Sequence, residues 1–222
     1  MVRRLSQRAA RVAGGPGVLL PCPAGRVRPE FLRRLLIGSG VAHVVATAVL
    51  APSEVAMRRA NGRGIVAFEL AGSAERAASI VSSWGLSGRR AARRSLVGDF
   101  GYMLTYGVLL TGVVEFVRRR VVEAGCRRWA VAGTGVEWLP LAAVGCDVVE
   151  GVALLRLLHG RGPAGTAGLA RRVAVAKFAC VGMGVGYSGV AAGYAWVGSP
   201  GRHEVLAPGV HSRASPRGVA GA

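Results

Sequence analysis

The sequence predicts an all-α integral membrane protein: a multi-pass helix bundle with four transmembrane helices and a short interfacial helix in the first loop. Two observations carry this prediction. Only 18% of the 222 residues are charged and the mean hydropathy is +0.40, whereas soluble domains carry about 25% charged residues. The apolar residues also gather in long stretches, and a helix of about 20 mostly apolar residues spans the hydrocarbon of a bilayer.

The expected spans are residues 35–51, 96–117, 130–158 and 173–197. The first is the shortest and contains His43. Together the spans define a transmembrane domain over residues 35–198, between a basic arm at 1–34 and a tail at 199–222. The arm is rich in Arg and the tail in Gly, Pro, Ser and Arg, so we expect both to be disordered.

The first loop carries the signals of a short amphipathic helix. Ser73 is a suitable N-cap, Glu75 lies in the first turn where the helix dipole favours an acid, and Gly85 is a suitable stop. Apolar residues recur at helical spacing, namely Leu70, Ala74, Ala77, Val81 and Trp84. Such a helix lies either in the membrane interface, with Trp84 at headgroup level, or against the ends of the bundle.

The net charge of +18 points to membrane anchoring and not to nucleic acid, because the arginines lie in the segments between apolar runs. The lipid bilayer is therefore the expected partner, together with a second membrane protein or another copy of the chain. With four spans, the side that bears both termini holds 16 arginines and the other side holds 12. The positive-inside rule then predicts a cell-membrane protein with cytoplasmic termini.

The cysteines form no CxxC pair, so we expect neither a metal site nor a thiol-oxidoreductase. We expect no cofactor. In the fourth span, glycines spaced as GxxxG predict close packing between helices. These are Gly182, Gly186, Gly189 and Gly193.

Ionisable residues inside expected spans are the main functional signal, because charge within a bilayer is costly. They are Asp99, Asp147, Glu150 and Lys177. At about 1.5 Å per residue, Asp99, Glu150 and Lys177 fall at similar depths, while Asp147 lies nearer the midplane. Tyr102 and Tyr106 follow Asp99 on its face of the helix and are expected hydrogen-bond donors.

Two interpretations of this cluster stay open. In the structural one, Lys177 pairs with Asp99 or Glu150 and fixes the helix register. In the functional one, three acids against one lysine require a proton, a cation or water, and Asp147 has no assigned cation. Two further acids are expected at the surface of the membrane: Glu115, paired with the nearby Arg118 group, and Glu137, beside Trp138.

Four segments resemble a family of uncharacterised bacterial four-helix integral membrane proteins: GIVAFELAGSAERAASIVSSWG (64–85), LVGDFGYMLTYGVLL (96–110), CDVVEGVALLRLL (146–158) and AVAKF (174–178). The resemblance covers about residues 35–197 and implies a fold and a membrane location but no activity. This chain has Gly151 where similar sequences often have Asn, and Gly101 where they often have a bulky apolar residue.

We therefore expect a non-enzymatic membrane protein whose acid/Lys cluster is structural or linked to protons or cations. The alternatives are a membrane-embedded enzyme acting on lipid and a subunit of a larger membrane complex. No residue is assigned a catalytic role.

Overall fold

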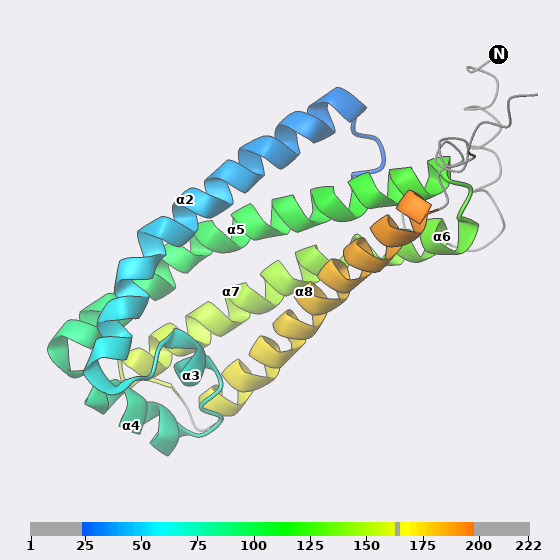
Figure 1. Cartoon of the computed structure of the whole chain (residues 1–222). Helices are drawn as coiled ribbons and strands as arrows, with labels where there is room; N and C mark the ends of the chain where they lie inside the picture. The colour runs from blue at the N-terminus through cyan, green and yellow to red at the C-terminus, as the bar shows by residue number, and fades with distance from the viewer. Residues whose placement is uncertain (1–23, 163–164, 198–222) are drawn as a thin grey trace, which may run out of the picture.

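A computed structural model describes residues 24–162 and 165–197, and all regular secondary structure in these ranges is helical (Figure 1). The predicted all-α class is confirmed. The helices are α2 (Pro29–Asn61), α3 (Ile65–Glu69), α4 (Ala74–Ser83), α5 (Gly85–Glu123), α6 (Arg127–Val136), α7 (Leu139–Leu158) and α8 (Thr166–Val197). The tail at 199–222 and residues 1–23 of the expected arm lie outside the described residues.

In the described part of the chain, three helices are long and apolar enough to cross a membrane: α2, α5 and α8. The expected third span, residues 130–158, is divided between α6 and α7. Helix α7 has 20 residues but carries Asp147, Glu150 and Arg156, so its composition alone does not make it a span.

The long helices extend well beyond the apolar stretches. Helix α2 begins at Pro29, ahead of the expected start at residue 35, and ends at Asn61, where Gly62 with a φ of 74° forms a left-handed C-cap. Helix α5 has 39 residues, which corresponds to a length of about 58 Å at 1.5 Å per residue. Hydropathy detects only the part of such a helix that suits hydrocarbon, so the arginine-rich ends were missed.

The break between α6 and α7 falls at Glu137 and Trp138. Pro140 lies in the first turn of α7. A proline has no N–H to donate and is well suited to the first turn of a helix, so Pro140 favours the start of a new helix at this point.

Helix α5 is the centre of the arrangement (Figure 1). Helix α2 packs mainly on α5, whereas α7 packs against both α5 and α8. Helices α2 and α7 run opposite to α5 and α8, so that the short helices α3 and α4 lie at one end of the bundle and α6 at the other (Figure 1). We call the first of these the loop end.

The predicted first-loop helix is confirmed as α4, and the Ser73 side chain accepts a hydrogen bond from the Arg76 N–H at 3.2 Å. Of the two expected positions for this helix, the structure has the one against the ends of the bundle, and Trp84 is not exposed toward headgroups. Trp84 is 1% exposed, packs edge-on against Phe68, and donates its indole N–H to the Arg63 carbonyl at 2.8 Å. The helix thus closes a core at the loop end, where the large indole face is buried among apolar neighbours and its N–H keeps a hydrogen-bond partner.

The fourth-span glycines do not mediate close helix packing within the described chain. A Cβ on Gly182, Gly186, Gly189 or Gly193 would meet no atom within 4 Å. The buried face of α8 is offset from them and includes Ala170, Ala174, Lys177, Gly184, Tyr187, Ser188 and Ala191. Close helix contacts occur instead at Gly184 against Leu110 and at Gly107 against Val144.

Candidate functional site

One lysine of α8 lies among three carboxylates inside the bundle. Lys177 Nζ lies 2.8 Å from Asp147 Oδ1, 2.7 Å from Glu150 Oε2 and 3.7 Å from Glu69 Oε2. Each of these side chains is at most 11% exposed. We call Glu69, Asp147, Glu150 and Lys177 the Lys–acid cluster.

The sequence explains part of this geometry. Asp147 and Glu150 are three residues apart on α7, which places both on the face toward α8. The predicted pair of Lys177 with Glu150 is confirmed, while the expectation that Asp147 has no cation is wrong, since Lys177 contacts both acids. Because the two carboxylates lie next to each other on one helix face, the Lys177 ammonium forms an ion pair with both.

Glu69 was not predicted as a member. It lies in α3, in the connection between α2 and α5, and this connection folds back onto α8. A signal was available, because Glu69 is the only charged residue in the apolar run Ile65–Ala71. Burial raises the pKa of Glu69, and the neighbouring Lys177 ammonium opposes that shift by lowering it.

The two predicted tyrosines, Tyr102 and Tyr106, contact different parts of the protein. The Tyr106 hydroxyl donates a short hydrogen bond to Asp147 Oδ2, so Asp147 is held from α5 as well as from α8. Tyr102 lies instead beside His43 of α2, with its hydroxyl 3.5 Å from His43 Nε2 and the two ring centroids 4.8 Å apart. One tyrosine therefore faces the Lys–acid cluster and the other faces α2.

Asp99 does not pair with Lys177. It is half-buried, and within the described ranges it has neither a hydrogen bond nor an ion pair. Asp99 therefore lies in the same region as the Lys–acid cluster, as its predicted depth implied, but it does not contact Lys177.

These residues line a groove bounded by α2, α5 and α8, with a volume of about 1120 Å³. We call it the α2–α8 groove. Its polar half contains Glu69, Asp99, Tyr102, Tyr106, Asp147 and Lys177. Its other half, farther from the loop end, is lined by apolar side chains, among them Leu109, Leu110, Val113, Val117, Val181 and Val185.

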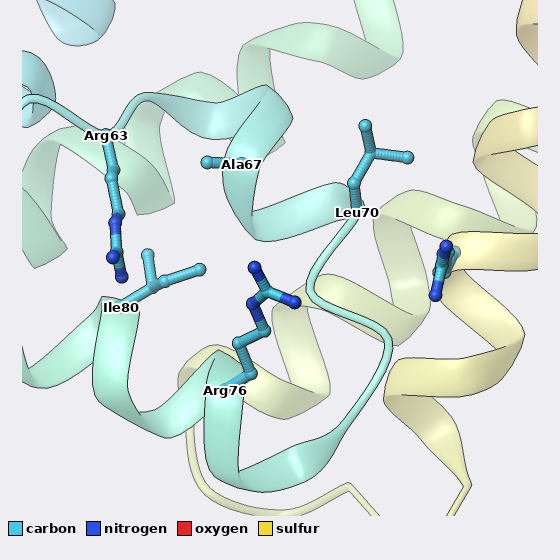
Figure 2. A pocket seen from close by; sticks show the side chains of 6 residues that line it. Arg63, Ala67, Leu70, Arg76 and Ile80 are labelled. Atoms are coloured by element: carbon cyan, nitrogen blue, oxygen red, sulfur yellow. The ribbon is translucent and has the colours of Figure 1, made fainter.

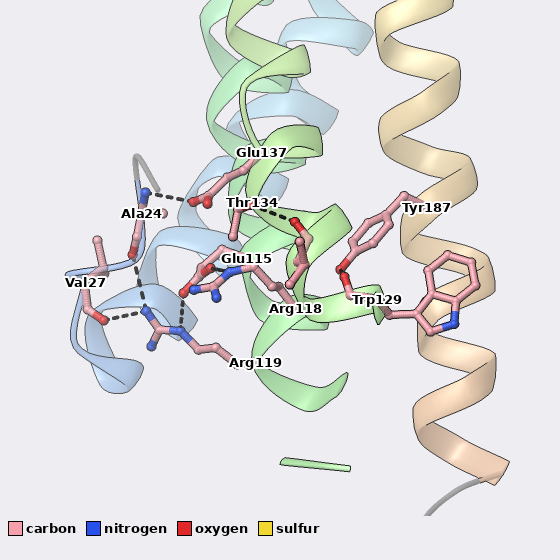
Figure 3. Close-up of polar contacts among 10 residues, drawn as sticks. Ala24, Val27, Glu115, Arg118, Arg119, Trp129, Thr134, Glu137 and Tyr187 are labelled. Carbon is pink, nitrogen blue, oxygen red and sulfur yellow. Dashed lines mark hydrogen bonds and ion pairs between the residues drawn. The ribbon is translucent and has the colours of Figure 1, made fainter. Parts of the chain in front are cut away.

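A second polar cluster lies at the opposite end of the bundle (Figure 3). Glu115 is fully buried and accepts hydrogen bonds from Arg118 and Arg119. Arg119 also donates to the Val27 carbonyl at 2.7 Å, and Glu137 accepts from the Ala24 N–H at 2.8 Å. The predicted pairing of Glu115 is confirmed, but neither acid is at the surface, because the segment before α2 covers them.

A smaller pocket of about 350 Å³ lies at the loop end (Figure 2). Three arginines, Arg63, Arg76 and Arg171, line it together with apolar side chains of α3 and α4. Exposed arginines at the end of membrane helices suit contact with lipid headgroups.

Comparisons of the chain with protein-family models, curated proteins and solved structures found no match. Within the described residues, no group of three His, Cys, Asp or Glu side chains is arranged to hold a metal ion. The class that the fold and site define is an all-helical protein with three membrane-length helices and a buried Lys–acid cluster.

Proposed function

We propose that this is a four-span cell-membrane protein that binds and exchanges a proton or a small monovalent cation at the Lys–acid cluster. The observation that carries the proposal is the mismatch of three carboxylates around one buried ammonium.

The charge balance supports exchange. With all groups ionised, the Lys–acid cluster carries two excess negative charges, and Asp99 in the same groove adds a third. Each unmatched charge within a membrane costs about 2.5–3.5 kcal/mol. The cluster is therefore most stable when protons or cations neutralise it, and three of its members, Glu69, Asp147 and Lys177, line the α2–α8 groove.

The direction of the helices supports a fourth span. Helices α5 and α8 run the same way (Figure 1), so a chain that crosses along α5 must return before it crosses again along α8. The helices between them are α6 and α7, and α7 packs along both neighbours. The two acids of α7 face that packing, since Asp147 and Glu150 are 3% and 1% exposed, whereas Arg156 is exposed in the last turn of the helix.

Labelling from the two sides of the membrane tests this topology. In a cysteine-free background, Glu123→Cys at the end of α5 and His159→Cys after α7 are both exposed reporter sites. Four spans place them on opposite sides, so a membrane-impermeant maleimide applied from one side labels only one of them. Labelling of both from the same side contradicts the fourth span. Accessibility of Glu123→Cys from the cytoplasm would support the orientation inferred from the arginines.

Proteoliposomes test the exchange. Wild-type protein is expected to carry protons or a monovalent cation down an imposed gradient, measured with an enclosed indicator dye. Asp147→Asn is expected to abolish the flux, whereas Val148→Ala, a 42% exposed neighbour on the same helix, retains it. A protein that folds but carries no flux under proton, sodium or potassium gradients contradicts the proposal and leaves the cluster with a structural role.

A further inference from the structure

We propose that the α2–α8 groove binds a hydrophobic organic ammonium, with the charged nitrogen beside Asp99 and against the aromatic rings that line the groove there, Tyr102 and Tyr106. This inference names a ligand class for the groove and rests on the proposed placement of the groove in the membrane.

Asp99 is the acid of the groove that lacks a partner. Asp147 is engaged by Lys177 and by Tyr106, and Glu69 and Glu150 share the same ammonium. Asp99 is half-buried, lines the groove, and has no hydrogen bond or ion pair in the part of the chain that the structure describes. A carboxylate in this position is satisfied by a positive charge that arrives with a ligand.

The side chains near Asp99 are aromatic, which favours binding of an organic cation. Tyr102 and Tyr106 follow it by three and seven residues on α5, and both line the groove. Their ring centroids are 6.0 Å apart with the planes tilted by 59°, and the His43 ring stands 4.8 Å from Tyr102. Aromatic faces attract ammonium groups within about 6 Å, most strongly where water is excluded.

An inorganic ion fits this position less well. A hard metal cation requires several oxygen ligands, and no metal-binding group of acids and histidines occurs among the described residues. The rings around Asp99 supply π-faces, which recognise the diffuse charge of a substituted ammonium. An anionic head group would be repelled by the same carboxylates.

The rest of the groove accommodates an apolar body. Beyond Tyr106 the wall of α5 continues as Leu109, Leu110, Val113 and Val117, and α8 contributes Val181 and Val185. The volume of about 1120 Å³ is at the upper end of the roughly 300–1,000 Å³ typical of sites for drug-sized ligands. The ligand is therefore an amphiphile whose charge lies near α3 and whose apolar part lies along the bundle.

Equilibrium binding to the full chain in nanodiscs tests this. The probe is radiolabelled dodecyltrimethylammonium at submicellar concentration, and dodecanol is the neutral analogue with the same tail. We expect saturable binding that dodecanol does not displace, and a loss of affinity of at least about tenfold in Asp99→Asn, since the variant removes a carboxylate of the groove that Lys177 does not already pair with. Val97→Ala, 56% exposed on the same helix and outside the groove, is the matched control.

The tyrosine pair gives an independent measurement if Asp99→Asn does not fold. Tyr102→Phe keeps a ring and is expected to bind as wild type does, whereas Tyr102→Leu is expected to bind several-fold more weakly. Equal affinity of the Phe and Leu variants overturns the inference. So does displacement by dodecanol as effective as by the ammonium, which would mean that bilayer lipid fills the groove through apolar contact alone.

The experiments distinguish failure of the ammonium site from failure of the proposed proton or cation exchange. Ammonium binding that is lost while proton or cation flux persists overturns this inference and leaves the proposed function. Binding that persists in Asp147→Asn, together with a wild-type protein that carries no flux, supports the ligand site and overturns exchange at the Lys–acid cluster.

Discussion

Lys177 Nζ lies 2.7 Å from Glu150 Oε2, so an ammonium of α8 and a carboxylate of α7 meet inside the bundle. The same nitrogen contacts Asp147 and Glu69. This arrangement joins α3, α7 and α8 at one atom, and it makes the charge state of the acids a determinant of both packing and function.

Removal of the ammonium is expected to destabilise the fold strongly. Lys177→Met leaves several buried carboxylates without a cation, which costs about 3–5 kcal/mol when one partner of a buried pair is lost. The double variant Lys177→Met with Glu150→Gln recovers part of this loss, as measured by denaturant unfolding in detergent. Met183→Ala, at a 52% exposed position of α8, is the control. Additive effects of the two substitutions contradict the coupling.

The Tyr106 hydroxyl is expected to matter more than the Tyr102 hydroxyl. Tyr106→Phe removes the donor to Asp147, and hydrogen bonds to charged groups contribute about 1.5–3 kcal/mol. Tyr102→Phe removes only a long contact of 3.5 Å with His43 and serves as the matched control. Thermal unfolding of both variants distinguishes them, and equal midpoints would show that the Tyr106 hydroxyl does not stabilise Asp147.

Glu69 is expected to make stability fall as pH rises. Its folded-state pKa is raised above the ordinary 4.5 by burial, so between these two values the folded protein holds a proton that the unfolded chain releases. The contribution is fully present below pH 4.5 and is lost as the pH rises through the folded-state value. Glu69→Gln should therefore flatten the decline of unfolding free energy with pH.

Glu75 provides a control of opposite sign for the same titration. Hydrogen bonds from its own backbone N–H and from Ser73 lower the pKa of Glu75 below 4.5, so its contribution is present above that pH and is lost in acid. Glu75→Gln should change the curve only on the acid side. A Glu69→Gln curve parallel to wild type would mean that the Glu69 carboxyl is not linked to folding.

Substitution of glycine by alanine is expected to destabilise the protein where the glycine is packed against a neighbouring helix, and not where it faces open space. A Cβ on Gly107 would lie 2.5 Å from Val144 Cγ2, and overpacking of this kind costs about 1–3 kcal/mol. Gly182→Ala has open space and should be neutral or slightly stabilising, because alanine favours helices over glycine by about 1 kcal/mol. Unfolding measured at two protein concentrations completes the comparison, since a concentration-dependent loss in Gly182→Ala would reveal a second copy packed on that face.

Three members of the Lys–acid cluster could be predicted because a charged residue within a long apolar stretch is visible in the sequence. Asp147, Glu150 and Lys177 stand out against long apolar surroundings, and helical spacing places the two acids on one face. Helix ends were less predictable, since arginine-rich turns continue α2, α5 and α8 beyond the apolar stretches.

Pairing and packing required the folded chain. Glu69 joins the cluster only because the first connection folds back onto α8, and Trp84 is buried only because α4 closes the loop end. Glu137 is buried by a segment more than 100 residues earlier, through its hydrogen bond to Ala24. Such contacts join positions that are distant in sequence, so no local pattern reports them.

The sequence by itself determined the helical class, the membrane-length apolar helices and the excess of acids over lysine within them. These follow from composition and spacing, which act over one or two helical turns. The tertiary structure alone decided that Lys177 shares its charge among three acids and that Asp99 has no partner within the described residues. The physical reason is that ion pairing depends on the rotation and offset of one helix against another, which packing at residues such as Gly107 and Gly184 sets.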